Sequence, residues 1–234
     1  MSTKSLQKLY DEGFFKPGHS EAVDECITNI VLLNTDQVFR TGVPRRIPRP
    51  ALPAEEFTFH WSRFVGAVTA NFPNIEPYNL TAITTLMVAE KRHQEELFLC
   101  QLIEALCPSC ESMCFLGHAY WHLEDRYLAL QCYQEAHRRS ERFCKERKLG
   151  PDNPNWLDAG DYLRYAAECQ LALDMPGDAL TSLVRCVQIF KAAGKYGTFK
   201  REDLTRIHRS VMEAAGWNAV GDLWEVPTEA PTGA

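Results

Sequence analysis

The sequence lacks long hydrophobic runs, a leader-like start and an excess of basic charge. No window approaches the roughly 18 uncharged apolar residues that a membrane-spanning helix needs. The first five residues, Met-Ser-Thr-Lys-Ser, do not resemble a signal peptide. The formal net charge of the 234 residues is −6, which argues against general nucleic-acid binding. We therefore expect no membrane span and no nucleic-acid partner.

The sequence also lacks the short motifs of several enzyme classes. It has no phosphate-binding loop, no Gly-x-Ser-x-Gly and no His-Glu-x-x-His. His118 and His122 are separated by Ala-Tyr-Trp, which supplies no general base. Three aspartates near one turn, Asp152, Asp158 and Asp161, lack the alternation of a calcium-binding EF-hand. We expect a protein that is not an enzyme and binds no cofactor.

Cysteine is plentiful, but its number is odd. Nine cysteines, five of them on segments predicted to be helical, favour reduced thiols and a cytoplasmic location. Cys107, Cys110, Cys114 and His118 recur at spacings that place the last three on one helix face. A Cys-x-x-Cys turn followed by helix ligands is one way to bind zinc, although eight helical residues rise about 12 Å. We expect no metal, and a zinc- or thiol-dependent regulatory module is the alternative function.

Four prolines between residues 44 and 53 mark the clearest boundary in the chain. Proline forbids a helix interior and favours an extended chain. We therefore predict a linker at 44–53 between an N-terminal helical arm at 1–43 and a helical domain at 54–216. The arm is predicted to contain helices at 3–12 and 20–33. Residues 217–234 are predicted to be a C-terminal tail, and no strand is predicted.

Within the helical domain, apolar residues recur every three or four positions. The first helix is predicted to end at Phe72-Pro73, and the next to run from Pro77 to Ala89. Its partner ends at Cys107-Pro108. A later helix is predicted to continue to Leu149 through a cluster of basic residues, which suits either a solvated helix end or a docking patch. The last helix is predicted to end at Ala215, where Gly216 closes it.

Residues 113–136 carry alternating small and large positions that predict two crossing antiparallel helices. They are Leu116, Gly117, Tyr120, Ala129, Tyr133 and Ala136. Gly117 and Ala129 are small where the backbones approach each other. This segment resembles the tetratricopeptide repeat superfamily, whose units must stack on neighbours. A degenerate unit at 77–110 has Glu96 in place of alanine, and another unit begins near Gly160. The resemblance covers about 77–193 and implies an all-α solenoid of about three repeats with a C-terminal capping helix.

Two segments resemble particular branches of this superfamily. Leu149-Gly-Pro-Asp-Asn-Pro154 is similar to the linker of kinesin-light-chain-type repeats. Ala166-Ala-Glu-Cys-Gln-Leu171 is similar to the chaperones that hold translocator proteins for type III secretion. Both likenesses imply a protein that binds other proteins.

The superfamily implies a concave groove, lined by the first helix of each repeat, that holds a peptide or protein segment. Carried over by position, the groove residues are Tyr78, Thr81, Thr85, Val88, Cys114, His118, Trp121, His122, Arg164, Glu168 and Leu171. Arg164 is the only cation among them, so a clamp for a C-terminal carboxylate is not expected. Trp121 is interpreted as an apolar anchor point, with packing against a neighbouring repeat as the alternative. The resemblance thus implies an adaptor or chaperone with a protein or peptide partner, which could form homo-oligomers.

Overall fold

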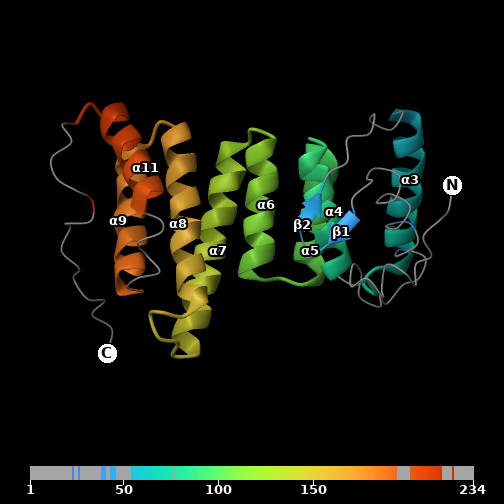
Figure 1. Ribbon diagram of the computed structural model, residues 1–234, viewed down its shortest axis with the longest axis horizontal. Coiled ribbons are helices and arrows are strands. Elements are labelled where there is room, and N and C mark those ends of the chain that lie inside the picture. Colours follow the sequence, from blue (N-terminus) through green and yellow to red (C-terminus); the bar gives the residue numbers. More distant parts are fainter. Residues whose placement is uncertain are drawn as a thin grey trace. The chain divides into compact units, whose positions relative to one another are not determined.

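The computed structural model describes residues 23, 26, 38–40, 43–45, 54–75, 77–193, 201–217 and 223. The chain divides into two compact units, Met1–Cys107 and Pro108–Ala234. The described residues of both units are mainly helical, as predicted (Figure 1). None of these helices has the length and apolar character needed to cross a membrane. The predicted domain limits at 44–53 and 217 stay predictions.

The N-terminal region contains a short hairpin that the sequence did not predict. Strand β1, Val38–Arg40, pairs antiparallel with β2, Val43–Arg45, so that Phe39 lies opposite Pro44. The expectation of no strand was therefore wrong. Proline fixes φ near −65° and excludes a helix, but a two-stranded ribbon tolerates it because one edge of each strand needs no partner.

Most of the other N-terminal predictions lie outside the described residues. The predicted helix at 3–12 and residues 46–53 of the linker are among these. Of the predicted helix at 20–33, Val23 and Cys26 are described, and both are helical and buried.

Between residues 54 and 106, the described part of the first unit forms three helices, and several of their ends follow the proline signals. They are α3, Ala54–Asn71; α4, Pro77–Ala89; and α5, His93–Leu106. Helix α4 packs against α5. The core draws on all three helices and on Val23 and Cys26, and its largest buried side chains include Phe64, Leu80 and Leu99.

The second unit contains five described helices. They are α6, Cys110–His122; α7, Arg126–Glu146; α8, Pro154–Ala172; α9, Pro176–Ala192; and α11, Arg201–Ala214. Helices α6 to α9 each pack against the next, and α11 packs on α9 and α8 (Figure 1). Helix α7 ends before the predicted Leu149, and α8 begins before the predicted Gly160. Asn153 caps α8 and Pro154 occupies its first turn, which accounts for the earlier start.

Three helix pairs share one type of turn, although their sequences differ. The turns between α4 and α5, α6 and α7, and α8 and α9 each have a central residue with positive φ, at Lys91 (57°), Glu124 (64°) and Asp174 (59°). In each turn, the next residue donates its backbone N–H to the carbonyl five positions earlier. These bonds are Arg92 to Met87 at 2.8 Å, Asp125 to Tyr120 at 3.0 Å and Met175 to Gln170 at 2.8 Å. The three pairs are therefore local copies of one helix–turn–helix geometry.

The crossing of α6 and α7 has the close contact that the sequence predicted. A Cβ atom at Gly117 would lie 2.7 Å from the Tyr133 ring, and Ala129 and Ala136 are fully buried. The same device recurs between α8 and α9, where a Cβ at Gly160 would lie 2.9 Å from Phe190. The second unit therefore packs an aromatic ring against a glycine at each of these two crossings.

The end of α11 agrees with the predicted glycine stop. Gly216 has a φ of 65°, and Trp217 donates its backbone N–H to Met212 at 3.0 Å. Beyond it, Leu223 is 4% exposed and belongs to the core of the second unit with Leu204 and Val211. Part of the segment predicted to be a tail therefore contributes to the core.

Candidate functional site

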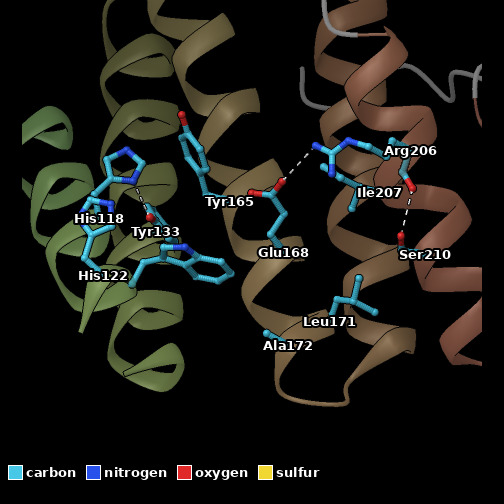
Figure 2. Close-up of a pocket in the computed structure, with 11 residues that line it drawn as sticks. His118, His122, Tyr133, Tyr165, Glu168, Leu171, Ala172, Arg206, Ile207 and Ser210 are labelled. Carbon is cyan, nitrogen blue, oxygen red and sulfur yellow. Dashed lines mark hydrogen bonds and ion pairs between the residues drawn. The ribbon is translucent and has the colours of Figure 1, made fainter. Parts of the chain in front are cut away.

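The second unit contains a cavity of about 540 Å³. Its walls come from α6, α7, α8 and α11, so residues far apart in the sequence lie together (Figure 2). The lining residues are His118, Trp121, His122, Tyr133, Tyr165, Glu168, Leu171, Ala172, Arg206, Ile207 and Ser210.

Five predicted groove residues line this cavity: His118, Trp121, His122, Glu168 and Leu171. Two others lie next to lining residues. The Sγ atom of buried Cys114 lies 3.5 Å from His118 Nε2, and the guanidinium of buried Arg164 lies 3.6 Å from Glu168.

The remaining predicted groove residues belong to the first unit and do not line the cavity. Tyr78, Thr81, Thr85 and Val88 lie on α4. Thr81 is half-buried, Thr85 and Val88 are exposed, and the side chain of Tyr78 is outside the described part of the chain.

Sequence reasoning missed the contribution of α11, which was predicted only as a cap. Arg206 and Ile207, with Ser210 one turn later, form one wall of the cavity. The amphipathic pattern of α11 predicts a buried face, but it does not reveal which helix that face meets. Tyr133 was predicted to fill space beside the helix crossing, and its ring also reaches the cavity.

His118 is the centre of a polar and aromatic cluster. Its Nδ1 is hydrogen-bonded to the Tyr133 hydroxyl at 2.7 Å. Its ring meets Tyr165 edge-on with 4.7 Å between centroids, and Tyr133 stacks on Tyr165 at 5.1 Å. Since both imidazole nitrogens have partners, the ring orientation is fixed.

The environment keeps these groups in their uncharged forms. Burial lowers the pKa of His118 to about 4, and the neighbouring His122 and Arg164 side chains add to this effect. Burial raises the pKa of the Tyr133 phenol well above its ordinary value, and it raises the pKa of Cys114 to about 12. A neutral imidazole beside a protonated thiol and a protonated phenol holds its neighbours by hydrogen bonds and has no activated nucleophile beside it.

We predict that His118 titrates near pH 4, well below the ordinary value of 6.5. The folded protein binds this proton more weakly than the unfolded chain does, so His118 reduces the stability of the fold as the pH falls from 6.5 toward 4. Above 6.5 this loss is absent. NMR titration of the His118 Cε1 proton measures the midpoint directly. A midpoint between 6 and 7 would show that the imidazole is solvated and would contradict the buried cluster.

Glu168 has an unusual set of partners on the opposite wall. Its carboxylate lies 3.6 Å from Arg164 and 4.0 Å from Arg206. Burial raises the pKa of Glu168, and the two arginines offset this effect only in part. Arg164 is also bound to Asp161 at 3.2 Å and lies over the Tyr165 ring at 4.1 Å. Among the described residues, the partners of Glu168 are therefore charged groups that lie beyond hydrogen-bond distance.

Trp121 is half-buried and has one face covered. The Arg126 guanidinium lies 3.7 Å from the indole ring and donates a hydrogen bond to the Trp121 carbonyl. The tryptophan packs against the core and also lines the cavity. Packing against the core is therefore observed for part of the ring, and the use of Trp121 as an anchor point stays a prediction.

The cysteine cluster does not have the features of a preformed zinc site. Within the described residues, Cys110, Cys114 and His118 do not form a group whose ligand atoms lie within 4.8 Å of one another. Burial raises the pKa of Cys110 to about 11, which opposes the thiolate form that zinc requires. None of the nine cysteines, all of which the structure describes, is in a disulfide, and Cys107 is exposed. We expect well under one zinc per chain by metal analysis, and stoichiometric zinc with stability lost on chelation would favour the alternative function.

Three residues of the basic cluster near the end of α7, namely Arg138, Arg139 and Lys145, form ion pairs within the unit. Arg138 and Arg139 each lie 2.9 Å from Glu135, and Arg139 also donates to the Ser109 carbonyl at 2.9 Å. Lys145 lies 3.3 Å from Glu141. These contacts give Arg138, Arg139 and Lys145 a role within the fold, and a docking patch at this helix end stays an untested alternative.

Comparison with known proteins found no matching family model, no matching curated protein and no matching solved structure.

Proposed function

We propose that this protein is a non-enzymatic adaptor or chaperone that holds a peptide or protein segment in the cavity of its second unit. The observation that carries this proposal is the cavity itself, which combines aromatic, apolar and polar walls. Such mixed concave surfaces suit side chains of a bound segment.

A tetratricopeptide-like solenoid is the fold that best accounts for the helix pairs. The turn centres at Lys91, Glu124 and Asp174 are 33 and 50 residues apart, and their geometry is shared. The first interval is close to a 34-residue repeat. The second interval is longer than one repeat because α7 and α8 are both longer than the helices of a standard repeat.

The helices that line the cavity support a groove of the kind this superfamily uses. Helices α6 and α8 are the first members of their pairs, and α11 follows them as the next first helix. Most lining residues come from these three helices, with Tyr133 of α7 at the base between them.

The chemistry of the lining supports binding rather than reaction. His118 has both ring nitrogens engaged and a pKa lowered to about 4, and the Cys114 thiol stays protonated. A general base that works at neutral pH needs a pKa of about 7, and a cysteine nucleophile needs a lowered pKa.

The experiment that tests this proposal is a pull-down with mass spectrometry from cells that contain the protein. The parent chain is compared with the Trp121→Ala variant, and Trp217→Ala serves as the matched control. Trp217 is exposed and does not line the cavity. The proposal requires partners that are lost with Trp121→Ala and kept with Trp217→Ala. Equal recovery of partners by all three proteins would exclude the cavity as the binding site.

A further inference from the structure

The cavity places a carboxylate whose two ion pairs are longer than hydrogen bonds beside an apolar wall, and we infer that the bound segment inserts a lysine or arginine side chain next to Glu168. This inference rests on the proposed function, because it names the chemistry of the segment that the cavity holds. It is carried by the bonding of Glu168, by the charges around it and by the arrangement of the walls.

Glu168 retains hydrogen-bonding capacity toward the cavity. Its side chain is 27% exposed, and its ion pairs with Arg164 and Arg206, at 3.6 and 4.0 Å, are both longer than hydrogen bonds. Within the described residues, no donor reaches hydrogen-bond distance of this carboxylate. An ionised carboxylate accepts about four hydrogen bonds. An ammonium or guanidinium group from a ligand therefore finds unused acceptor positions here.

Neither arginine already fills the role of a ligand cation. Arg164 is held by Asp161 and by the Tyr165 ring, so its guanidinium does not close on Glu168. Arg206 reaches across from α11, but its side chain is 67% exposed and its approach is at the limit of an ion pair. Solvent screens such a pair strongly. Arg206 therefore lies near Glu168 but is bound to it only weakly, so a ligand cation can displace it.

The charges that face Glu168 favour a cation over an anion. Asp161 and Asp203 contribute negative charge, and Arg164 and Arg206 contribute positive charge. With Glu168 itself, three carboxylates stand against two guanidinium groups. His118, on the facing wall, is neutral at physiological pH. An acidic side chain in the cavity would be repelled by Glu168, whereas a basic side chain would neutralise the excess negative charge.

The apolar wall suits the rest of a basic side chain. Leu171 and Ala172 lie one turn along α8 from Glu168, and Ile207 projects from α11 (Figure 2). The methylene stem of lysine or arginine packs on such a wall while its charged head reaches a carboxylate. The bound segment therefore carries a basic residue close to an apolar one.

The test uses random 12-residue peptides displayed on phage and selected on the full chain. An enriched peptide is then synthesised, and its Kd is measured with the parent protein, with Glu168→Gln and with the matched control Glu213→Gln. Glu213 is exposed on α11 and does not line the cavity. We expect one position of the enriched peptides to be lysine or arginine. Replacing that residue with glutamine weakens binding to the parent and to Glu213→Gln at least tenfold, but to Glu168→Gln less than threefold. Arg206→Ala binds the unchanged peptide at least as tightly as the parent.

Two contrary results have different meanings. Peptides that lose affinity for Trp121→Ala but share no basic position, or show no coupling to Glu168, overturn the cation inference and leave the proposed function intact. Peptides that bind Trp121→Ala as tightly as the parent, or a selection with no enrichment, overturn both.

Discussion

Gly117→Leu should unfold the second unit or destabilise it strongly. A Cβ atom at this position already lies 2.7 Å from the Tyr133 ring, and that ring is buried in the core. Overpacking a core typically costs about 1–3 kcal/mol, and leucine adds three more carbon atoms beyond Cβ. We therefore expect a loss at or above the upper end of that range. Chemical denaturation followed by circular dichroism measures it.

Two further variants test whether the loss of stability comes from the contact with Tyr133. Gly117→Ala should destabilise the unit despite a gain of about 1 kcal/mol in helix propensity. Combining it with Tyr133→Leu should recover part of that loss, because the smaller side chain leaves room for the new methyl group. Gly177→Ala is the matched control, since nothing lies within 4 Å of a Cβ there. If Gly117→Leu melts like the parent, the close crossing of α6 and α7 is excluded.

Trp121→Ala should weaken binding of the partner by about 2 kcal/mol, or about 30-fold in Kd. The indole lines the cavity, so its removal takes away a large apolar contact surface. The fold should persist with a modest loss of stability, because Arg126 binds the backbone carbonyl of residue 121 and not only its ring. Titration of a partner peptide, with circular dichroism of the same samples, separates the two effects.

The control and the contrary outcomes of this experiment are distinct. Trp217→Ala should bind the peptide like the parent, since Trp217 is exposed outside the cavity. Parent-like binding by Trp121→Ala would remove the tryptophan from the site. Unfolding of Trp121→Ala would show that its contacts with the core dominate.

Several helix ends were predictable because the signals that set them are local. Proline after Phe72 and at Pro77 fixes two ends, and Gly216 ends α11 through its positive φ. The close helix crossing at Gly117 was also predictable, because such a crossing needs a small residue where the two backbones approach each other. These features depend on a few neighbouring residues, which a sequence displays directly.

The cavity wall formed by α11 was not predictable, because it depends on packing between helices that are distant in the sequence. Arg206 and Ile207 reach the site only because α11 folds back on α8 and α9. Leu223 joins the core for the same reason, although its local sequence resembles a tail. The β1–β2 hairpin was missed because proline-rich sequence favours an extended chain without indicating whether it pairs.

Site-specific photocrosslinking from inside the cavity tests the proposed binding site most directly. A photoreactive phenylalanine analogue replaces Leu171, on the cavity wall, or Tyr127, which is 62% exposed on α7 outside it. Both proteins are irradiated with the pull-down partner, with and without the Trp121→Ala change. We predict a crosslink from position 171 that disappears with Trp121→Ala, and none above background from position 127. A crosslink from position 127 alone, or one from 171 that survives Trp121→Ala, would contradict binding in this cavity.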